Sequence, residues 1–200
     1  MKITQKEWMK NGQREKRNLK LRNLKLRNIN HPNQSNDIAD GTIHNNIHLM
    51  GVNVRCAVPS DLTAVRKIDH ESFGERSYPL FVLRQYLDCF GSLFRVAVVN
   101  NEIIGFIIGG IEFDKSIGWG LALIVSKPYR NSGIGALLIK ELLVEFRLKR
   151  IKKIKCLVDP QNLGAIKLYQ KLGFARRETI IDYYNRNENE QRILMMIDIL

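Results

Sequence analysis

The chain has 200 residues, of which 32 are Lys or Arg and 20 are Asp or Glu, so its formal net charge is +12. This length predicts one domain with an extension, and the lack of any uncharged apolar run of about 18 residues excludes a membrane-spanning helix. Its three cysteines form no Cys-x-x-Cys pair, which is typical of reduced thiols in a cytoplasm and predicts no zinc site.

The first fifty residues differ from the rest in charge and in pattern. They carry ten Lys and Arg against four acidic residues, and their histidines have no acidic or cysteine partner at metal-ligand spacing. Leucines two and three residues apart in LKLRNLKLRN (19–28) give neither a helix nor a strand a single apolar face. We therefore expect 1–50 to be a basic, disordered extension and 51–200 to be the folded domain. Residues 1–49 are interpreted either as a tail or as an over-extended start before Met50.

From residue 52 the pattern becomes that of strands and helices. VNVRCAV (52–58) predicts a strand, and Pro59 begins a helix that runs to about Phe73. A second short helix follows Pro79. The next two strands, LFRVAVVN and EIIGFIIGGIEF, are joined by Asn100-Asn101, a dipeptide that favours a two-residue hairpin turn.

The second half of the domain alternates strands with helices. WGLALIV (119–125) predicts a buried strand, and the helix after it has one apolar face, formed by Ile134, Leu137, Leu138, Leu142 and Phe146. Strand IKKIKCLV (151–158) leads to a helix that begins after Asn162 and ends at Gly173. Two closing strands are expected near 174–183 and 192–199. This order indicates an α/β protein with a mixed central sheet and helices on both faces.

The segment KPYRNSGIGALL (127–138) joins a strand to a helix through a glycine-rich loop. Such a loop aims unpaired backbone N–H groups at one point, where the helix dipole favours an anion. Gly133 and Gly135 let a ligand approach the main chain, and Arg130 adds a positive charge. The loop is therefore predicted to hold phosphate. The nucleotide patterns G-x-x-x-x-G-K-[ST] and G-x-G-x-x-G are both absent here.

The spacing R-x-x-G-x-G after a strand resembles the pyrophosphate loop of the GCN5-related N-acetyltransferases, the GNAT superfamily, which bind acetyl-CoA. VDPQNLGAIKLYQKLGF (158–174) resembles the second motif of that family, N-x-x-A-x-x-L-Y-x-x-x-G-F. It matches at Asn162, Ala165, Leu168, Tyr169, Gly173 and Phe174. The resemblance covers about residues 52–200. It implies the GNAT acyl-CoA N-acyltransferase fold, with acetyl-CoA as co-substrate.

The resemblance also implies roles for particular residues. The strand before the loop would bind the pantetheine arm through the backbones of Leu123, Ile124 and Val125. The pyrophosphate would lie against Arg130, Asn131, Ser132, Gly133, Ile134 and Gly135. Asn162 and Tyr169 would flank the thioester, and Tyr169 would be the general acid that protonates the departing thiolate. The alternative is a core tyrosine that packs beside Leu168 and Leu172.

Two further stretches resemble protein N-terminal acetyltransferases. ERSYPLFVLRQYL (75–87), which includes Tyr78, resembles the loop between their first two helices, a wall of the peptide-binding cleft. DYYNRNENEQRILMM (182–196) is similar to their strand-turn-strand segment, and Tyr183 and Tyr184 occupy the positions of a tyrosine pair that contacts the peptide. The alternative is a tyrosine pair that covers a strand edge. Both stretches point toward the ribosomal-protein alanine acetyltransferases and their archaeal and eukaryotic relatives.

One departure from the family concerns the general base. Two positions that supply it in relatives are Leu157 and Trp119 here, and neither side chain accepts a proton. Glu75, Glu112 and Asp159 are the candidate substitutes. An α-amine with a pKa of about 8 is roughly one-tenth neutral at pH 7, whereas a lysine amine with a pKa of about 10.4 is far less so. A missing base therefore favours an α-amine, or an ordinary primary amine of a small metabolite, as the acceptor.

These observations predict an acetyl-CoA-dependent N-acetyltransferase that acts on protein N-termini by direct attack of the amine on the thioester. Two alternatives stay open: acetylation of a small-molecule amine, and a non-catalytic acetyl-CoA-binding sensor. We expect a cytoplasmic protein with no membrane partner, whose basic extension makes a weak contact with ribosomal RNA.

Overall fold

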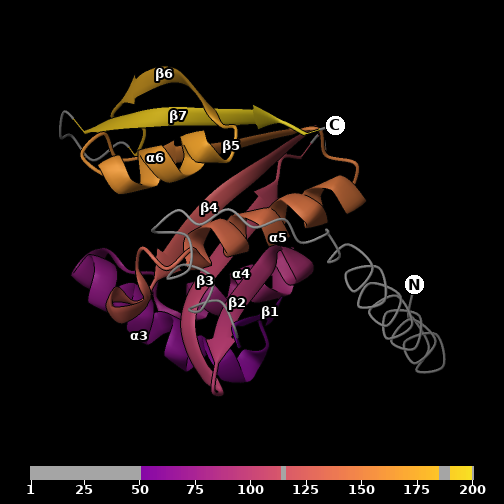
Figure 1. Ribbon diagram of the computed structural model, residues 1–200, viewed down its shortest axis with the longest axis vertical. Coiled ribbons are helices and arrows are strands. Elements are labelled where there is room, and N and C mark those ends of the chain that lie inside the picture. Colours follow the sequence, from indigo (N-terminus) through magenta and orange to yellow (C-terminus); the bar gives the residue numbers. More distant parts are fainter. Residues whose placement is uncertain (1–50, 114–115, 185–189, 200) are drawn as a thin grey trace, which may run out of the picture. The chain divides into compact units, whose positions relative to one another are not determined.

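The computed structural model describes residues 51–113, 116–184 and 190–199 (Figure 1). The strands of this part are β1 (Asn53–Cys56), β2 (Phe94–Val99), β3 (Glu102–Ile111), β4 (Ile117–Val125), β5 (Lys153–Val158), β6 (Ala175–Ile181) and β7 (Gln191–Asp198). Its helices are α3 (Leu62–Phe73), α4 (Leu80–Phe90), α5 (Ile134–Leu148) and α6 (Leu163–Lys171), with short 3-10 turns η1 (Pro59–Asp61), η2 (Gly74–Arg76), η3 (Gly91–Leu93) and η4 (Lys127–Tyr129). The predicted extension and its RNA contact lie outside the described residues.

The described strands form one sheet in the order β1-β2-β3-β4-β5-β7-β6. Neighbouring strands are antiparallel except β4 and β5, which run parallel. Figure 1 shows α5 over one face of this sheet and α3 and α4 over the other. The predicted mixed sheet with helices on both faces is confirmed. Because β4 and β5 are parallel, the loops that follow them lie at the same edge of the sheet.

The predicted hairpin turn at Asn100-Asn101 is also confirmed. Val99 of β2 pairs with Glu102 of β3, so the loop between them has two residues. Asn100 and Asn101 have φ angles of 47° and 65°. Positive φ at both central residues is what a type I′ turn requires, and asparagine tolerates it well.

An apolar cluster holds each layer of helices to the sheet. On one face α5 and α6 pack against the strands, and on the other α3 and α4 do so. Two strand glycines make room for α5, since a Cβ atom at Gly118 would lie 2.7 Å from Cε1 of Phe146. A Cβ atom at Gly109 would lie 2.7 Å from Cδ1 of Leu142. The close approach of α5 to the sheet therefore depends on these glycines.

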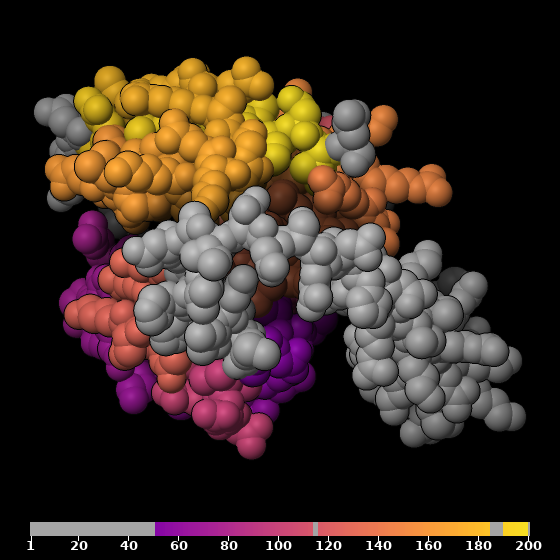
Figure 2. Space-filling view, in the orientation of Figure 1, coloured from indigo at the N-terminus to yellow at the C-terminus, as the bar shows by residue number. Residues whose placement is uncertain are grey.

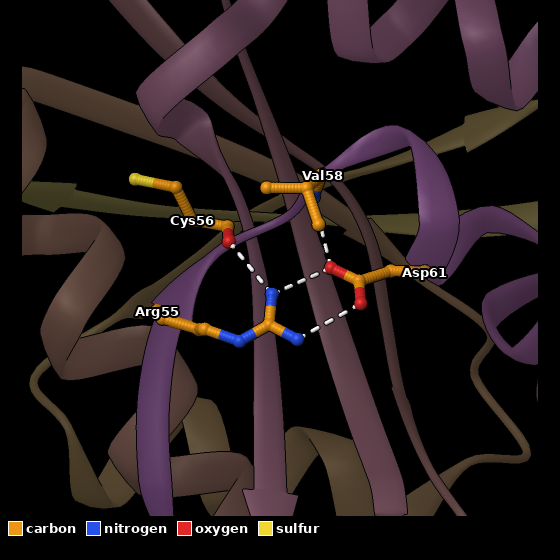
Figure 3. A network of polar contacts seen from close by, with 4 residues as sticks. All are labelled: Arg55, Cys56, Val58 and Asp61. Atoms are coloured by element: carbon orange, nitrogen blue, oxygen red, sulfur yellow. Dashed lines mark hydrogen bonds and ion pairs between the residues drawn. The ribbon is translucent and has the colours of Figure 1, made fainter. Parts of the chain in front are cut away.

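A polar network joins β1 to the start of α3 (Figure 3). The guanidinium of Arg55 donates to both carboxylate oxygens of Asp61, at 2.6 and 2.8 Å, and the backbone N–H of Val58 donates to one of them at 2.8 Å. The hydrogen bonds from Arg55 hold the pKa of the Asp61 carboxyl below its usual range. The bidentate geometry fixes the chain where strand becomes helix.

In the space-filling view, the orange and yellow atoms of α6, β6 and β7 gather at one end of the folded domain (Figure 2). None of the helices in the described ranges is long and apolar enough to cross a membrane. Cys56 and Cys89 are exposed and Cys156 is buried, and all three are free thiols. No cluster of three or more His, Cys, Asp or Glu side chains suited to a metal ion occurs within the described part of the chain.

Candidate active site

The sheet opens between its two parallel strands. β4 and β5 pair from Ile117 with Lys153 to Gly120 with Cys156, and their pairing ends there although both strands continue. On the other side of β4, the register with β3 shifts so that Leu121 is an extra residue, a β-bulge. A bulge bends its strand and increases the local twist. The opening between β4 and β5 therefore begins at the residue where the bulge occurs.

The backbone beyond the bulge faces this opening at alternate residues. Ser126 donates its backbone N–H to the carbonyl of Ile104 on β3, at 2.9 Å. Because successive residues of a strand direct their N–H and C=O groups to opposite edges, Ile124 also faces β3, while Leu123 and Val125 face the opening. Of the three residues expected to bind pantetheine through the backbone, Leu123 and Val125 therefore face the opening, although the carbonyl of Val125 accepts a hydrogen bond from Arg130.

The loop after β4 leads into the N-terminus of α5 with two residues in the left-handed region. Asn131 has a φ angle of 62° and Gly133 one of 90°. The first helical hydrogen bond runs from the N–H of Leu137 to the carbonyl of Gly133, and no side chain of the described residues caps the helix. The N–H groups of 134–136 are therefore available to an anion, as the sequence predicted.

Arg130 is held beside the opening by two hydrogen bonds. Its Nε donates to the carbonyl of Val125 at 3.0 Å, and its Nη2 donates to Oγ of Ser72 on α3 at 3.3 Å. The hydroxyl of Ser132 donates to the carbonyl of Tyr129 at 2.5 Å, which stiffens the same loop. The guanidinium charge consequently lies at the end of β4, close to the free N–H groups of α5.

The two sequence motifs meet in the structure. A Cβ atom at Gly135, in the first turn of α5, would lie 3.1 Å from Cδ2 of Leu168 on α6. Gly135 was predicted to admit a ligand to the main chain, and the structure adds a second requirement, the close packing of α5 on α6. The predicted cap of α6 is confirmed, since Oδ1 of Asn162 accepts the N–H of Ala165 at 3.0 Å.

The C-terminus of α6 is closed by Gly173, as predicted. The N–H of Gly173 donates to the carbonyl of Gln170 at 2.9 Å, and that of Phe174 donates to the carbonyl of Tyr169 at 3.0 Å. This is a Schellman motif, in which Gly173 has the positive φ angle of 92° that glycine adopts readily. The ring of Phe174 lies edge-on to Tyr169, with centroids 5.1 Å apart. The motif thus fixes the ring of Tyr169.

Tyr169 of α6 belongs to the same core cluster as Cys156. Cys156 is the partner of Gly120 in the last strand pair before β4 and β5 separate. Tyr169 is 9% exposed and belongs to the α5–α6 core, so it is both a core residue and a group at the opening. Burial raises the pKa of Tyr169 well above its usual range and that of Cys156 to about 12. Both groups are therefore protonated at neutral pH.

Two of the predicted acceptor-binding tyrosines lie close together. Tyr78, just before α4, is half-buried against Tyr86, with ring centroids 5.4 Å apart, and its backbone N–H donates to Asp69 at 2.6 Å. Burial, and then the nearby Tyr86 and Tyr184, raise the pKa of Tyr78 to about 12. Tyr184 also stacks edge-on with Tyr183, at 5.0 Å. Tyr184, in one of the two segments predicted to line the acceptor site, thus acts electrostatically on Tyr78 in the other.

Neither family position for a general base carries a titratable group. Leu157 lies on β5, directly after Cys156, the last residue that pairs with β4. Trp119 lies on β4 and pairs with Lys155. Nε1 of Trp119 donates to Glu112 at 2.8 Å, and Nζ of Lys155 lies 3.6 Å from the same carboxylate oxygen. Glu112 is therefore next to one of these positions, although its carboxylate is already paired.

A charged cluster at the end of β5 had no signal in the sequence. Arg192 of β7 forms ion pairs with Asp159, at 3.7 Å, and with Glu190, and its guanidinium lies 5.5 Å from the ring centroid of Tyr184. This cluster links Tyr184 to the end of β5, the strand that borders the opening. Among the candidate bases, Asp159 is thus at the site, whereas Glu75 lies on the surface turn η2.

Residues 62–174 match the acetyltransferase (GNAT) family model, and this is more than half of the chain. The chain belongs to the GNAT family. The match begins at the first residue of α3 and ends at Phe174, so it includes the opening, the loop after β4 and all of α6. The two motifs that predicted this family are thus part of one family-wide pattern.

Two relatives extend this result. The GNAT domain is 29% identical over 137 residues to an uncharacterized N-acetyltransferase of Methanocaldococcus jannaschii, a match that covers 68% of this chain and 85% of that protein. It is 27% identical over 147 residues to an N-alpha-acetyltransferase of Saccharolobus solfataricus, covering 68% of this chain and 87% of that protein. The protein is accordingly an acetyl-CoA-dependent N-acetyltransferase.

Solved structures share the GNAT fold. Ard1 from Thermoplasma volcanium superimposes with a TM-score of 0.69 at 23% identity, over 75% of this chain and 99% of that chain. The protein yncA from Salmonella typhimurium, solved with its cofactor acetyl-CoA, has a TM-score of 0.66 at 18% identity, over 75% and 95%. Naa20 from Chaetomium thermophilum, solved with a bisubstrate analogue, has a TM-score of 0.65 at 27% identity, over 74% and 86%. Acetyl-CoA is the co-substrate of this GNAT protein.

Proposed function

We propose that the protein transfers the acetyl group of acetyl-CoA to the α-amine at the N-terminus of another protein. Two observations support this proposal: Tyr184, from a distant segment, helps to raise the pKa of Tyr78, and Arg192 links Tyr184 to Asp159 at the end of β5. Tyr78 and Tyr184 would contact an extended peptide whose first residue reaches the opening. The similarity to proteins named N-alpha-acetyltransferase supports the same acceptor.

We place acetyl-CoA along the free edge of β4. The pantetheine arm would hydrogen-bond to the backbones of Leu123 and Val125 in the manner of an added strand. Its pyrophosphate would accept hydrogen bonds from the N–H groups of 134–136 and pair with the guanidinium of Arg130. The thioester would then lie near Gly120, where the opening begins and whose partner Cys156 shares a core cluster with Tyr169.

In the proposed reaction the neutral amine attacks the thioester carbonyl directly. The C–N bond forms, the C–S bond breaks, and the electron pair of the C–S bond passes to the sulfur of CoA. Tyr169 donates its proton to that sulfur, the nitrogen loses one proton to solvent, and the tyrosine regains one from solvent, so that the products are an amide and the CoA thiol. A tyrosine that burial keeps protonated at neutral pH suits the role of acid.

The acceptor amine must be neutral to attack. Since Leu157 and Trp119 supply no base, the intrinsic pKa of the amine decides how much of it is reactive. An α-amine with a pKa of about 8 loses roughly tenfold in reactive fraction at pH 7, and a lysine amine far more. This favours α-amines. A small primary amine of low pKa is the second candidate acceptor, because the same reasoning admits it.

Initial rates with a set of peptides test the proposal. The peptides would differ in their first two residues, with matched peptides whose α-amine is formylated and which retain an internal lysine. We expect free α-amines to be acetylated and formylated peptides to be inert. Turnover of a polyamine but of no peptide would establish the small-molecule alternative, and acetyl-CoA binding without turnover of any amine would establish a sensor.

The cellular setting is a separate proposal. Free thiols at exposed Cys56 and Cys89 suit a reducing compartment, and we propose the cytoplasm. Contact of the basic residues 1–50 with ribosomal RNA stays a prediction. Weakening of ribosome co-sedimentation by added salt would support it, because phosphate contacts release counterions.

A further inference from the structure

A buried carboxylate of α3 is bonded to the turn between α3 and α4, residues 74–79. Asp69 is 0% exposed, and its Oδ2 accepts the backbone N–H of Tyr78 at 2.6 Å. Its Oδ1 is also buried and has no hydrogen-bond partner among the described residues. A buried carboxylate oxygen without a partner costs free energy, so stability alone does not explain an aspartate at this position.

The residue next to Asp69 holds the other end of the same turn. Nδ1 of His70 lies 3.0 Å from the carbonyl oxygen of Gly74 and 3.3 Å from Oγ of Ser77. Within the turn, the backbone N–H of Ser77 donates to the carbonyl of Gly74 at 3.0 Å. Two adjacent residues of α3 therefore fix the turn, and the contact with Tyr78 itself comes from Asp69.

We infer that Asp69 is a positioning residue for the acceptor: by fixing the backbone of Tyr78, it sets where the tyrosine ring meets the incoming peptide. This inference rests on the proposed contact of Tyr78 with the acceptor. The hydrogen bond from the N–H fixes the main chain of Tyr78, and the edge-on contact with Tyr86 fixes its ring. The two contacts together hold the ring in one orientation.

Asp69 acts through Tyr78 and not on the amine. Its full burial separates the carboxylate from the acceptor, so Asp69 does not replace the missing general base. Burial also raises the pKa of this carboxyl above its usual range. The contact needs only an oxygen that accepts an N–H, and asparagine supplies one without a buried charge. Asp69→Asn therefore separates an effect of the hydrogen bond from an effect of the charge.

Steady-state kinetics of the full chain with acetyl-CoA and a peptide that begins with serine test this inference. Asp69→Ala removes the accepting oxygen, and Asp88→Ala, at an exposed position on α4, is the matched control. We expect Asp69→Ala to raise KM for the peptide on the order of tenfold, as loss of a hydrogen bond to a charged group does. We expect Asp69→Asn and Asp88→Ala to leave KM unchanged, and calorimetry to show unchanged affinity for acetyl-CoA in all three.

A loss of stability alone has a different signature. It lowers the amount of folded enzyme, and therefore the apparent kcat with every amine, but it leaves KM unchanged. A rise of KM in Asp69→Ala that Asp69→Asn does not share supports positioning. An unchanged KM in Asp69→Ala, or an equal rise in Asp69→Asn, would overturn the inference. If Asp69→Ala does not fold, Asp69→Leu removes the oxygen without leaving a cavity and provides the same comparison.

Combining Asp69→Ala with Tyr78→Ala tests whether the effect passes through the tyrosine ring. If Asp69 acts by placing that ring, it has no further effect on KM once the ring is gone. A further rise of KM in the double variant would overturn the inference while leaving the proposed transfer to α-amines intact. An unchanged KM in Tyr78→Ala alone would overturn it by removing the acceptor contact on which it rests.

Discussion

Gly120 of β4 lies opposite Cys156 of β5, and the two parallel strands separate immediately after this pair. The separation follows from the extra residue Leu121, which shifts the register between β3 and β4. The pairing of β4 with β5 thus ends where the bulge occurs, and the backbone of β4 beyond it faces the opening. Tyr169 shares a core cluster with Cys156, so the tyrosine that we propose as general acid packs near the point where the strands separate.

The burial of Cys156 predicts selective thiol labelling. At pH 8 a maleimide-type reagent should modify the exposed Cys56 and Cys89 and spare Cys156, because its pKa is raised to about 12 and its thiolate fraction is correspondingly small. All three should react in denaturant. Mass mapping of the labelled peptides checks this. Rapid labelling of Cys156 in the native protein would mean that the thiol is open to solvent.

The proposed pyrophosphate site predicts a loss of acetyl-CoA affinity in the double variant Arg130→Ala, Gly133→Val. Removing the guanidinium takes away a charge-assisted contact, and valine is strained at the φ angle of 90° that Gly133 adopts. We expect at least a tenfold rise in Kd by calorimetry, about 1.4 kcal/mol. Lys127→Ala, in the preceding turn, is the control for a general loss of positive charge. Unchanged affinity in the double variant would remove this loop from the site.

The fit of α5 on the sheet predicts that Gly118→Ala destabilises the fold. A Cβ atom there would lie within 2.9 Å of three ring atoms of Phe146, and overpacking of this kind costs about 1–3 kcal/mol. Urea unfolding measures the change in free energy. Gly164→Ala is the control, because the nearest described atom to its Cβ would be 3.7 Å away, and helix propensity predicts a gain of about 0.5–1 kcal/mol. Equal stability of the two variants would refute the account of α5 packing.

The lack of a base at Leu157 and Trp119 predicts that the pH profile follows the acceptor. The value of kcat/KM for a peptide should rise roughly tenfold per pH unit below about 8, the pKa of its α-amine, and level off above it. A peptide with an amine of lower pKa should shift the midpoint downward. A limb in the acid range that is independent of the acceptor, and that disappears in Glu112→Gln or Asp159→Asn, would instead reveal an enzyme base.

The features that were predicted correctly from the sequence depend on residues close together in the chain. Asn162 and Ala165 are three residues apart, so the cap of α6 needs only its neighbours along the chain. The glycine at the end of α6 and the asparagines of the β2–β3 turn follow the same rule. The resemblance to the GNAT family implied chemical roles that residue spacing alone does not predict, above all the role of general acid for Tyr169.

Contacts between distant segments explain what was missed. The bulge at Leu121 depends on how β3 and β4 align, which no local pattern encodes. Arg95 lies in the predicted strand LFRVAVVN, and the structure shows that it is buried and pairs with Glu145 at 2.5 Å and Glu141 at 3.4 Å on α5. Cys156 of β5 and Tyr169 of α6 likewise belong to one core cluster although they are distant in the chain.

Tandem mass spectrometry of a single peptide tests acetyl transfer to an α-amine most directly. The peptide would begin with serine, carry one internal lysine, and be incubated with acetyl-CoA and the full chain. We predict one acetyl group on the first residue and none on the lysine. Acetylation of the lysine alone, or no acetylation of either amine by protein that binds acetyl-CoA, would contradict the proposed function.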